Sequence, residues 1–569
     1  MNGIRPENEY VQELAAVQED IARLIKFTKR HRAELEELLN RASNSSFKDS
    51  VNELLEKTPE LTSRYLDGNS VSFYLRENEL GRAKIWAEVL RSKPTKSLSD
   101  LRALRLLETK LGNVSKTLTL THEIAIQDKS VAASGVRLLE GRVRELLGVR
   151  PRIPGPVKPI SNRVSNRVVH LVKESRPNLS NGFTSRSHKN FLAEKKAGLE
   201  PIVITEPGFP DNNPRTHREF VDGILHIRLG FGDINYSQLP VDQFNQLFAD
   251  LAYEEIKNLR PEFIHASSGR RGYETALVGL ALKYKTEIPL VYEVRSFFEA
   301  NWTDNTALES TGEIFECRMA IEKVCMDESD RVLTICHTMK DDLVARGIDP
   351  NKIGIIPNAV DLDHFSPMQR DVELAATYSL SDFATFGYVS NMDHYRESQE
   401  TLIEAMAELK QRGVRAKCVL VGGGPRADKL KKLAIDFGVE QEVIFTGAVD
   451  HNLIDKYYSL IDVFVVPRIA ERAATFVTPL KPFEAMAELK PVVTSDLPAL
   501  IEITRAPERG LSFAAGNSIA LADTLESLFH DEDLQRNLAR AGRDWVKEER
   551  TWDLNGERYV SEFSKLKGK

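Results

Sequence analysis

The sequence predicts two doubly wound α/β domains in tandem, preceded by an all-α region. Three observations lead to this prediction. Residues 7–147 show helical periodicity and almost no strand signal. From residue 166 onward, short apolar runs alternate with helical stretches, a pattern typical of parallel sheets covered by helices on both faces. Near residue 357 the alternation ends and starts again, so a second sheet follows the first.

The bulk composition is that of an ordinary globular protein with several domains. The chain has 569 residues, of which 41% are hydrophobic and 28% charged, and its formal net charge is −7. This charge gives no overall attraction to nucleic acid, so we expect no nucleic-acid partner. No apolar stretch is long enough to cross a bilayer, and the N-terminus lacks the apolar core of a signal peptide. We expect a cytoplasmic protein, with peripheral contact at the inner face of the membrane as a further possibility.

The N-terminal region, residues 1–147, contains two runs with coiled-coil spacing. In the first run, Leu14–Leu38, mostly apolar residues recur at alternating intervals of three and four, and two polar residues interrupt them. The second run is Ala132–Leu146. Two interpretations remain open: amphipathic helices packed within one small bundle, or a self-associating coiled coil that would make the protein a homo-oligomer.

Residues 148–165 contain four prolines and are predicted to be a linker, because proline removes a backbone donor and excludes helix. The first α/β domain is expected over residues 166–375 and the second over 376–545. Strands are predicted at 168–172, 201–205, 263–266, 290–294 and 331–335, and then at 385–389, 417–421, 443–445, 463–466 and 491–494. Two parallel sheets whose carboxyl ends face one cleft suit an enzyme with two substrates.

A glycine-rich turn follows one strand of the second domain. In Leu420-Val421-Gly422-Gly423-Gly424-Pro425 the strand leads into glycines and then into a helix. Such a turn lets the backbone at Gly423 approach a ligand, although a purely structural turn uses glycine as often. Further along the chain come a strand ending in Gly447, the run Asp462–Pro467, the run Lys481–Ala487 and the strand at 491–494.

This order and spacing resemble the retaining glycosyltransferases of family GT4. The segment Pro357-Asn358-Ala359-Val360-Asp361 is similar to that family's interdomain connection. The resemblance extends from about Val168 to the end of the chain and does not include the helical region. It implies the GT-B fold, with two Rossmann-like domains facing a cleft and a last helix, within residues 546–569, that crosses back to the first domain.

The resemblance also implies an activity. A sugar would move from a nucleotide-diphosphate-sugar donor to a hydroxyl of a glycan or lipid-linked glycan acceptor, with retention of anomeric configuration, in bacterial surface polysaccharide or glycoconjugate synthesis. The diphosphate leaves with added negative charge, which cationic side chains stabilise. The leaving phosphate would act as the base on the acceptor hydroxyl, so we expect neither a catalytic metal nor a separate cofactor.

Several residues of the second domain match donor-binding positions of the family. Glu484 matches the carboxylate that binds the ribose, and it is equally well placed to cap a helix. The backbone N–H groups of Thr478 and Leu480, on either side of Pro479, would hold phosphate or sugar oxygens. Lys481 would contact the diphosphate or the sugar, which makes it a catalytic candidate, although a solvated lysine is the plainer interpretation.

Two positions depart from the family's pattern. The family's second carboxylate is replaced by Phe476, and Glu471, in a loop longer than usual, is a candidate substitute. Of the family's two phosphate-binding cations only one has a counterpart, Arg396, which can hold a phosphate bidentately. Either Arg468 or Lys481 would supply the second cation.

Four residues of the first domain are candidates for contacts with the acceptor or the transferred sugar. Gly182, after the first strand, would let the backbone approach the ligand or would be an ordinary loop glycine. Glu293 and Arg295 lie near the position where many relatives have a sugar-contacting histidine. They would form a structural pair or orient the sugar or the acceptor hydroxyl. His265 would be a catalytic residue or a hydrogen-bonded histidine at a strand end.

Two rival functions share the predicted architecture. A nucleotide-sugar 2-epimerase also uses two Rossmann-like domains, and it would act on the nucleotide-sugar alone because it needs no acceptor. A non-catalytic scaffold would keep the fold and self-associate through the N-terminal helices. The interdomain connection and the run Lys481–Ala487 favour the transferase over the epimerase.

Overall fold

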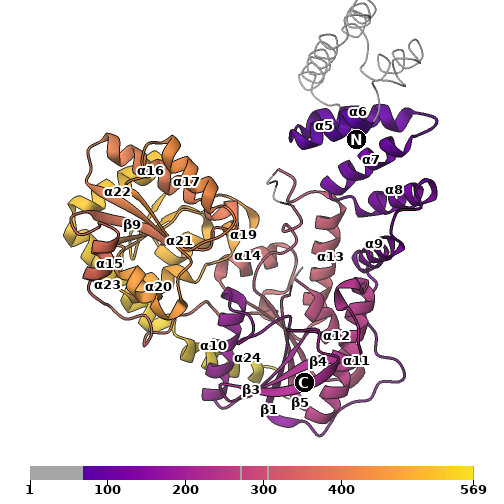
Figure 1. Ribbon diagram of the computed structural model, residues 1–569. Coiled ribbons are helices and arrows are strands. Elements are labelled where there is room, and N and C mark those ends of the chain that lie inside the picture. The colour runs from indigo at the N-terminus through magenta and orange to yellow at the C-terminus, as the bar shows by residue number, and fades with distance from the viewer. Residues whose placement is uncertain (1–67, 270–271, 304, 306, 568–569) are drawn as a thin grey trace, which may run out of the picture. The chain divides into compact units, whose positions relative to one another are not determined.

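The computed structural model describes residues 68–269, 272–303, 305 and 307–567 (Figure 1). Its Cα positions divide the chain into two compact units. Of the described residues, 68–147 and 311–316 belong to one unit, and those within 148–310 and 317–567 belong to the other.

The described part of the first unit is all helical, which confirms that prediction. Its helices are α5 (Gly68–Arg76), α6 (Leu80–Ser92), α7 (Leu98–Lys110), α8 (Val114–Gln127) and α9 (Ala133–Leu146). Ser97 and Asp100 cap α7 reciprocally, each side chain accepting a hydrogen bond from the other residue's backbone N–H. Apolar side chains of α5, α6 and α7 form the core of the unit.

The two predicted coiled-coil runs have different outcomes. The run Leu14–Leu38 lies outside the described residues. The run Ala132–Leu146 forms α9, which packs against α8 and buries Val143 and Leu146. Self-association of the helices stays a prediction.

The first α/β domain contains a sheet built from strands β1 to β8, here with their bounds: β1 (Val164–Val172), β2 (Glu200–Thr205), β3 (Arg215–Val221), β4 (Ile224–Phe231), β5 (Pro261–Ser267), β6 (Leu290–Val294), β7 (Arg331–Thr334) and β8 (Ile353–Ile355). Their order in the sheet is β3-β4-β2-β1-β5-β6-β7-β8. Every neighbouring pair is parallel except β3–β4. The strands predicted in this domain correspond to β1, β2, β5, β6 and β7.

The antiparallel pair β3–β4 is a hairpin that the sequence-based prediction lacked. Asp222 and Gly223 connect the strands with φ angles of 50° and 73°. Two consecutive positive φ values are what a two-residue type I′ turn requires, and Asp-Gly is its usual sequence. That dipeptide was therefore the available signal for this hairpin.

Helices cover both faces of the first sheet (Figure 1). They are α10 (Gly182–Lys196), α11 (Val241–Leu259), α12 (Glu274–Thr286), α13 (Gly312–Glu328) and α14 (His337–Ala345). Residues 148–163 contain neither helix nor strand. They are nevertheless held to this domain, because Lys158 N–H and Ile160 N–H donate to the carbonyls of Lys285 and Thr286.

The second α/β domain contains an all-parallel sheet of β9 (Ala384–Val389), β10 (Ala416–Val421), β11 (Val443–Gly447), β12 (Val463–Val466), β13 (Val492–Ser495) and β14 (Leu511–Phe513). Their order is β11-β10-β9-β12-β13-β14. The helices are α15 (Val372–Thr377), α16 (Gln399–Gln411), α17 (Ala427–Asp436), α18 (Ile454–Ser459), α19 (Arg472–Phe476), α20 (Lys481–Ala487), α21 (Pro498–Thr504), α22 (Ser518–His530) and α23 (Glu532–Glu549). Two doubly wound sheets, the first parallel apart from β3 and the second all-parallel, confirm the predicted fold class.

The helix α24 (Trp552–Ser564) follows the second domain in sequence but packs on the first. It lies against α10, and Gly556 makes this possible, because a Cβ there would stand 2.3 Å from the carbonyl oxygen of Ala193. Phe563 stacks on Phe263 of β5 with ring centroids 5.0 Å apart. These contacts hold α24 against α10 and β5.

Among the described residues, no helix is both long and apolar enough to span a bilayer.

Candidate active site

The carboxyl ends of β9, β10, β11 and β12 bring four of the predicted donor-binding residues to one edge of the second sheet. Arg396 follows β9, Gly423 follows β10, Gly447 ends β11 and Arg468 follows β12. In an open parallel sheet, loops at the carboxyl ends of the strands form the usual ligand site. The topology therefore brings these four residues to the edge at which open parallel sheets usually bind ligands.

The glycine turn after β10 is required by close backbone packing. A Cβ at Gly422 would lie 2.1 Å from the carbonyl oxygen of Ser390, and one at Gly424 would lie 2.5 Å from a carboxylate oxygen of Asp393. Gly423 accepts a hydrogen bond from Met392 N–H through its carbonyl, at 2.8 Å. These contacts join the loops after β9 and β10, so the glycines have a structural role whether or not they approach a ligand.

Arg468 is bound to a buried carboxylate. Its guanidinium donates to both oxygens of Glu397, at 2.8 and 3.1 Å, and to the carbonyl of Val477 at 3.2 Å. Burial alone would raise the pKa of Glu397, but the charge and hydrogen bonds of Arg468 lower that pKa to about 2. Arg468 is thus largely committed to positioning the loop that contains Val477.

Arg396 is the less committed of the two arginines. Its side chain is 25% exposed, and its nitrogens stand 3.8 Å from the carboxylates of Glu397 and Glu471. These distances exceed hydrogen-bond length, and Nη1 has no hydrogen-bond partner among the described residues. A guanidinium that is a quarter exposed and has one unused donor can still take a phosphate.

Glu471 is buried and caps α19. Its Oε2 accepts from Ala474 N–H at 3.0 Å, while Oε1 faces Arg396. The longer loop after β12 has thus folded into a short helix that uses Glu471 as its cap. A role of Glu471 in binding the sugar stays a prediction.

Glu484 and Lys481 lie in α20, one turn apart. Glu484 Oε2 accepts a hydrogen bond from the Tyr458 hydroxyl at 2.6 Å, which fixes the carboxylate and leaves Oε1 available. Lys481 is half-buried and has no hydrogen-bond or ion-pair partner among the residues that the structure describes. A fixed carboxylate beside an unpaired ammonium can bind ribose hydroxyls and phosphate respectively.

The loop Thr478–Leu480 before α20 is held from the first domain. Asn358 donates through Nδ2 to the carbonyl of Thr478 at 2.7 Å. Gly182 lies nearby, since a Cβ there would meet Leu480 Cδ1 at 3.8 Å, an ordinary contact distance. Both observations place the predicted residues Gly182, Thr478, Pro479 and Leu480 in one neighbourhood.

Glu293 is the centre of a buried polar network in the first domain. Its two oxygens accept hydrogen bonds from Arg186 at 2.6 Å, from Arg295 at 3.0 Å and from the Tyr559 hydroxyl at 3.0 Å. His265 Nε2 stands 3.2 Å from the same carboxylate. Burial would raise the pKa of Glu293, but the two guanidinium groups hold it well below its ordinary value.

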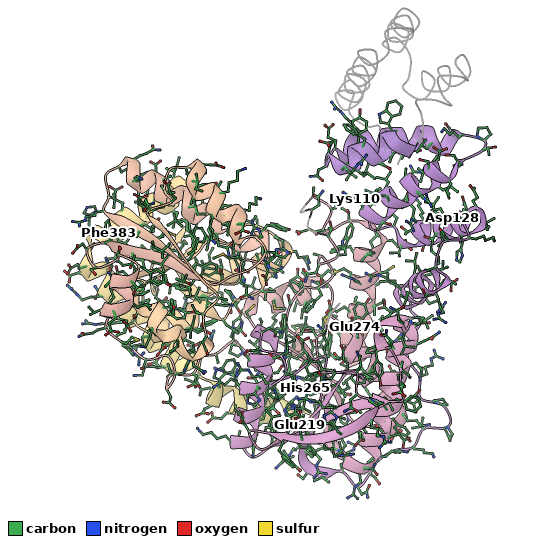
Figure 2. All side chains as sticks on the ribbon, viewed as in Figure 1. Lys110, Asp128, Glu219, His265, Glu274 and Phe383 are labelled. Atoms are coloured by element: carbon green, nitrogen blue, oxygen red, sulfur yellow. The ribbon has the colours of Figure 1, made fainter. Side chains whose placement is uncertain are left out.

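The burial of the three catalytic candidates in the first domain, Glu293, Arg295 and His265, distinguishes between a structural and a catalytic role. Glu293 and His265, which is labelled in Figure 2, are at most 1% exposed. Of the two interpretations left open by the sequence, the structural pair is the one that this placement favours. Arg295 differs, because it also lines a cavity of about 160 Å³ at the edge of the sheet. It remains a candidate for contact with a substrate.

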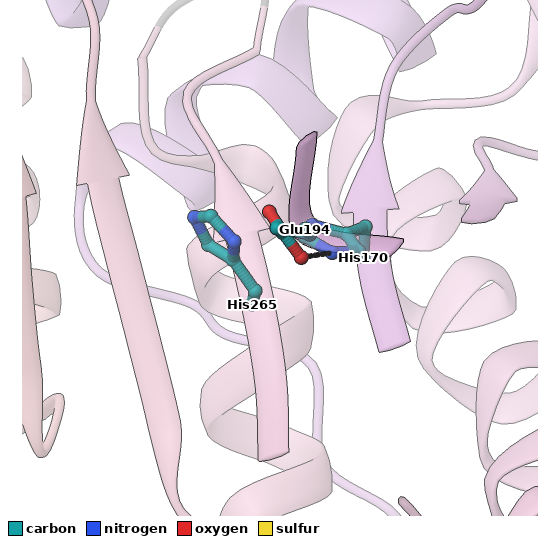
Figure 3. Close-up of side chains that lie close together, drawn as sticks. All are labelled: His170, Glu194 and His265. Atoms are coloured by element: carbon teal, nitrogen blue, oxygen red, sulfur yellow. Dashed lines mark hydrogen bonds and ion pairs between the residues drawn. The ribbon is translucent and has the colours of Figure 1, made fainter. Parts of the chain in front are cut away.

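His265 also belongs to a group with the spacing of metal ligands, shown in Figure 3. Ligand atoms of His170, Glu194 and His265 lie within 4.8 Å of one another, and His170 Nε2 stands 2.9 Å from Glu194 Oε2. Glu194 already interacts electrostatically with Arg295. A dication would share this dry site with that guanidinium, and the repulsion between them favours a His–Glu hydrogen bond over a metal site.

Arg186 and Asn358 connect the buried network to the loop before α20, and the sequence-based assignment missed both roles. Besides Glu293, Arg186 donates to the carbonyl of Pro357 at 2.8 Å and to Asn358 Oδ1 at 3.0 Å. Asn358 in turn holds Thr478. The signal for Asn358 was its place in the Pro-Asn connection, whereas nothing in the sequence around Arg186 indicated its partners.

Family comparisons agree with this geometry. The family described as Glycosyl transferases group 1 matches residues 375–545, and the family described as Glycosyltransferase Family 4 matches residues 192–364. The chain belongs to the GT4 glycosyltransferases. The two matched segments of this GT4 protein fall in its second and first α/β domains, and the match to the first domain begins within α10.

Curated relatives match parts of the GT4 protein. A GDP-mannose-dependent alpha-(1-6)-phosphatidylinositol monomannoside mannosyltransferase of Mycobacterium tuberculosis is 32% identical over 201 residues, 35% of this chain and 52% of the relative. An alpha-D-kanosaminyltransferase of Streptomyces kanamyceticus is 28% identical over 30% of this chain and 42% of the relative. The chain thus spans about half the length of these relatives.

Solved structures show the fold. Sucrose-phosphate synthase from Thermosynechococcus elongatus superposes with a TM-score of 0.57 and 20% identity, covering 70% of this chain and 99% of the other. Anabaena HepE in complex with UDP-glucose gives a TM-score of 0.54 and 15% identity over 70% of this chain and 99% of the other. The GT4 protein therefore has the GT-B fold.

Proposed function

We propose that this protein is a retaining glycosyltransferase that moves a sugar from a nucleotide-diphosphate-sugar to a hydroxyl of a glycan or lipid-linked glycan. The observation that supports this most directly is the pair Glu484 and Lys481. The carboxylate is fixed by Tyr458, and the ammonium makes no hydrogen bond or ion pair within the described residues, although its charge acts on Glu397. Together with Arg396, the pair offers the charges that a ribose and a diphosphate need, at the carboxyl edge of a parallel sheet.

In the proposed reaction, the bond between the sugar C1 and the diphosphate oxygen breaks, and a bond from C1 to the acceptor oxygen forms on the same face. The acceptor's proton goes to the departing diphosphate, so no protein base is needed. Lys481 and Arg396 stabilise the charge that develops on the diphosphate. Glu484 binds the ribose and positions the donor.

The test begins with purified protein and a panel of nucleotide-sugars. GDP-mannose comes first because the mycobacterial relatives are named as dependent on it. A bound donor should raise the unfolding temperature, since ligands stabilise the state to which they bind. Release of free sugar and nucleoside diphosphate, or of glycosylated acceptor, then reports turnover.

Substitutions in the site separate the proposal from its rivals. Glu484→Gln and Lys481→Met should each reduce turnover by at least tenfold, whereas the exposed matched controls Glu440→Gln and Lys429→Met should retain it. Full activity in the Glu484/Lys481 double variant would contradict the site assignment. Conversion of the donor to its 2-epimer without acceptor would establish the epimerase instead, and donor binding without any turnover would favour the scaffold.

A chelator tests the expected metal independence. Because the diphosphate is assigned to side-chain cations, transfer should persist in EDTA at the rate seen without it. Loss of transfer in EDTA with recovery on adding Mg²⁺ would show that a metal shares this role. Peripheral membrane contact and self-association through the N-terminal helices remain separate proposals, to be tested by vesicle sedimentation and by light scattering.

A further inference from the structure

The first α/β domain has a second cavity that the donor does not account for. It encloses about 370 Å³ at the carboxyl ends of β2 and β4, between the loops that follow these strands and the helices α11 and α12. This volume lies at the lower end of the range of roughly 300–1,000 Å³ typical of small-molecule sites. Every residue that lines it belongs to the first domain.

One wall of this cavity is aromatic and rigidly built. Phe209, Tyr236 and Phe244 line it. Tyr236 packs directly on Gly208, where φ is +82° and a Cβ would stand 2.4 Å from the tyrosine ring, so only glycine fits. The Tyr236 hydroxyl accepts a hydrogen bond from the backbone N–H of Phe231 at 2.7 Å, which fixes the ring. The apolar C–H face of a sugar packs well on aromatic rings of this kind.

A buried amide lines the same cavity without a partner. Asn245, in α11, is 1% exposed, and neither Oδ1 nor Nδ2 has a hydrogen-bond partner among the described residues. Leaving buried polar atoms unpaired costs on the order of 1–3 kcal/mol. The amide offers donors and an acceptor side by side, which matches two neighbouring hydroxyls.

The charges on the described lining are mostly negative. Glu206 and Glu274, the latter labelled in Figure 2, contribute two carboxylates, and Lys173 contributes one ammonium. Carboxylates accept hydrogen bonds from hydroxyls and repel anions. The lining therefore suits a neutral polyhydroxylated ring better than a phosphate.

This cavity adjoins the smaller cavity of about 160 Å³ that Arg295 lines. Lys173 and Gly269 line both. The smaller cavity also contacts Phe183, the residue after Gly182, at the start of α10. A ligand could therefore extend from the neighbourhood of Gly182 and Arg295 into the larger cavity.

We propose that the larger cavity binds a neutral sugar ring of the acceptor, adjacent to the ring whose hydroxyl receives the transferred sugar. The reacting ring occupies the smaller cavity, and its neighbour packs on Phe209 and Phe244 and hydrogen-bonds to Asn245. The acceptor is then a glycoside of at least two rings. This inference rests on the proposed transferase function and specifies the acceptor of that reaction.

The test uses Asn245→Leu, an apolar variant of nearly the same size. Because Asn245 has no partner in the described residues, removing its polar atoms should leave the unfolding temperature unchanged or higher. The matched control is Gln243→Leu, an exposed amide two residues earlier in the same helix. Binding of gluco-, galacto- and mannobioses, of the corresponding monosaccharides and of myo-inositol 1-phosphate is measured by ligand-observed NMR, with donor affinity measured in parallel.

The expected result is that at least one disaccharide binds tenfold or more tightly than its monosaccharide, and that Asn245→Leu abolishes this gain while donor affinity is retained. Equal disaccharide affinity in Asn245→Leu and the wild type would overturn the inference. So would tighter binding of inositol 1-phosphate than of every disaccharide, or no disaccharide binding by protein that still binds its donor. Failure to bind any donor would instead count against the proposed function.

Discussion

Glu293 shows how a single residue can carry much of the first domain's polar interior. It is fully buried, and its carboxylate accepts from two arginines and one tyrosine that lie 107, 2 and 266 residues away in the sequence. Its low pKa keeps it ionised throughout the physiological range. Removing one partner from a buried ionic network leaves charges uncompensated, which is far more costly than breaking a surface pair.

Glu293→Gln should therefore destabilise the protein strongly. We expect the free energy of unfolding to fall by about 3 kcal/mol, because Arg186 and Arg295 lose their counter-charge. Urea unfolding at pH 7, followed by circular dichroism, measures the change. The control is Glu532→Gln, whose side chain is 81% exposed and paired with Arg536, and which should change stability by less than about 0.5 kcal/mol. Similar midpoints for the two variants would contradict this role of Glu293.

Glu488, which follows α20, should make the stability of the fold decrease as pH rises from about 4.5 to about 8. Burial raises the pKa of this carboxyl to about 8, and neither oxygen has a hydrogen-bond partner among the described residues. The pKa of Glu488 in the folded state lies above its unfolded value near 4.5. The contribution of this carboxyl to the free energy of unfolding is therefore fully present below pH 4.5 and is lost as pH rises through 8.

Glu488→Gln should accordingly be more stable than the wild type at pH 9, by on the order of 5 kcal/mol, and nearly equal to it at pH 4.5. Thermal unfolding at the two pH values measures the difference. A constant difference across this range would show that Glu488 does not titrate as described.

At the scale of single elements, the turn between β10 and α17 is determined by close packing rather than by conformational freedom alone. Gly422 has a φ of +132°, and a Cβ there would meet the carbonyl oxygen of Ser390 at 2.1 Å. Gly438, at the end of α17, also has a positive φ, of +67°, but a Cβ there would meet nothing within 4 Å. An alanine at Gly438 would therefore cause backbone strain alone, whereas an alanine at Gly422 would cause both backbone strain and a steric clash.

Gly438→Ala should lower the free energy of unfolding by about 1 kcal/mol, the usual penalty of a positive φ. Gly422→Ala should lower it by at least twice as much and should also weaken donor binding. Urea midpoints and donor titrations measure both effects. If Gly422→Ala is no worse than Gly438→Ala, the loops after β9 and β10 can separate without consequence.

The elements themselves could largely be predicted from local sequence. Apolar runs such as Leu290–Val294 correspond to strands because a parallel strand is buried on both faces. The short strand β14 was missed, since Leu511–Phe513 is too short to give a clear pattern. Glu471 could not be assigned as a helix cap, because nothing in the sequence indicated that its long loop would form α19.

The residues of the site were predictable only where a motif marks them. Glu484 and Arg396 were recognised by their spacing within the family's pattern. Arg186 and Asn245 were not, because their significance lies in what surrounds them: a carboxylate 107 residues away for the first, and the absence of a described partner for the second. Contacts between distant segments leave no signal in a single sequence.

At the scale of the whole molecule, α24 completes the core of a domain to which it does not belong in sequence. Phe563 is 1% exposed and packs with Phe263, Tyr559 and His265 against the first sheet. Phe563→Ala should cost about 3–5 kcal/mol, as for other large buried aromatic residues.

The control for this variant is Val560→Ala on the same helix, where the side chain is 37% exposed. It should cost less than about 1 kcal/mol. Differential scanning calorimetry with and without donor distinguishes the domains, because a donor should stabilise the second domain. If Phe563→Ala lowered only the unfolding temperature of the second domain, the placement of α24 on the first domain would be contradicted.

The position of α24 has a consequence for synthesis on the ribosome. Domains usually fold in the order in which they emerge, N-terminal first. Here the segments that make the first sheet emerge early. Phe263 nevertheless lacks its packing partner Phe563, and Glu293 lacks its hydrogen-bond donor Tyr559, until residues beyond 550 have been translated. The second domain, contiguous over β9–α23, can finish folding before the first, so the nascent chain exposes an incomplete apolar surface for most of its elongation.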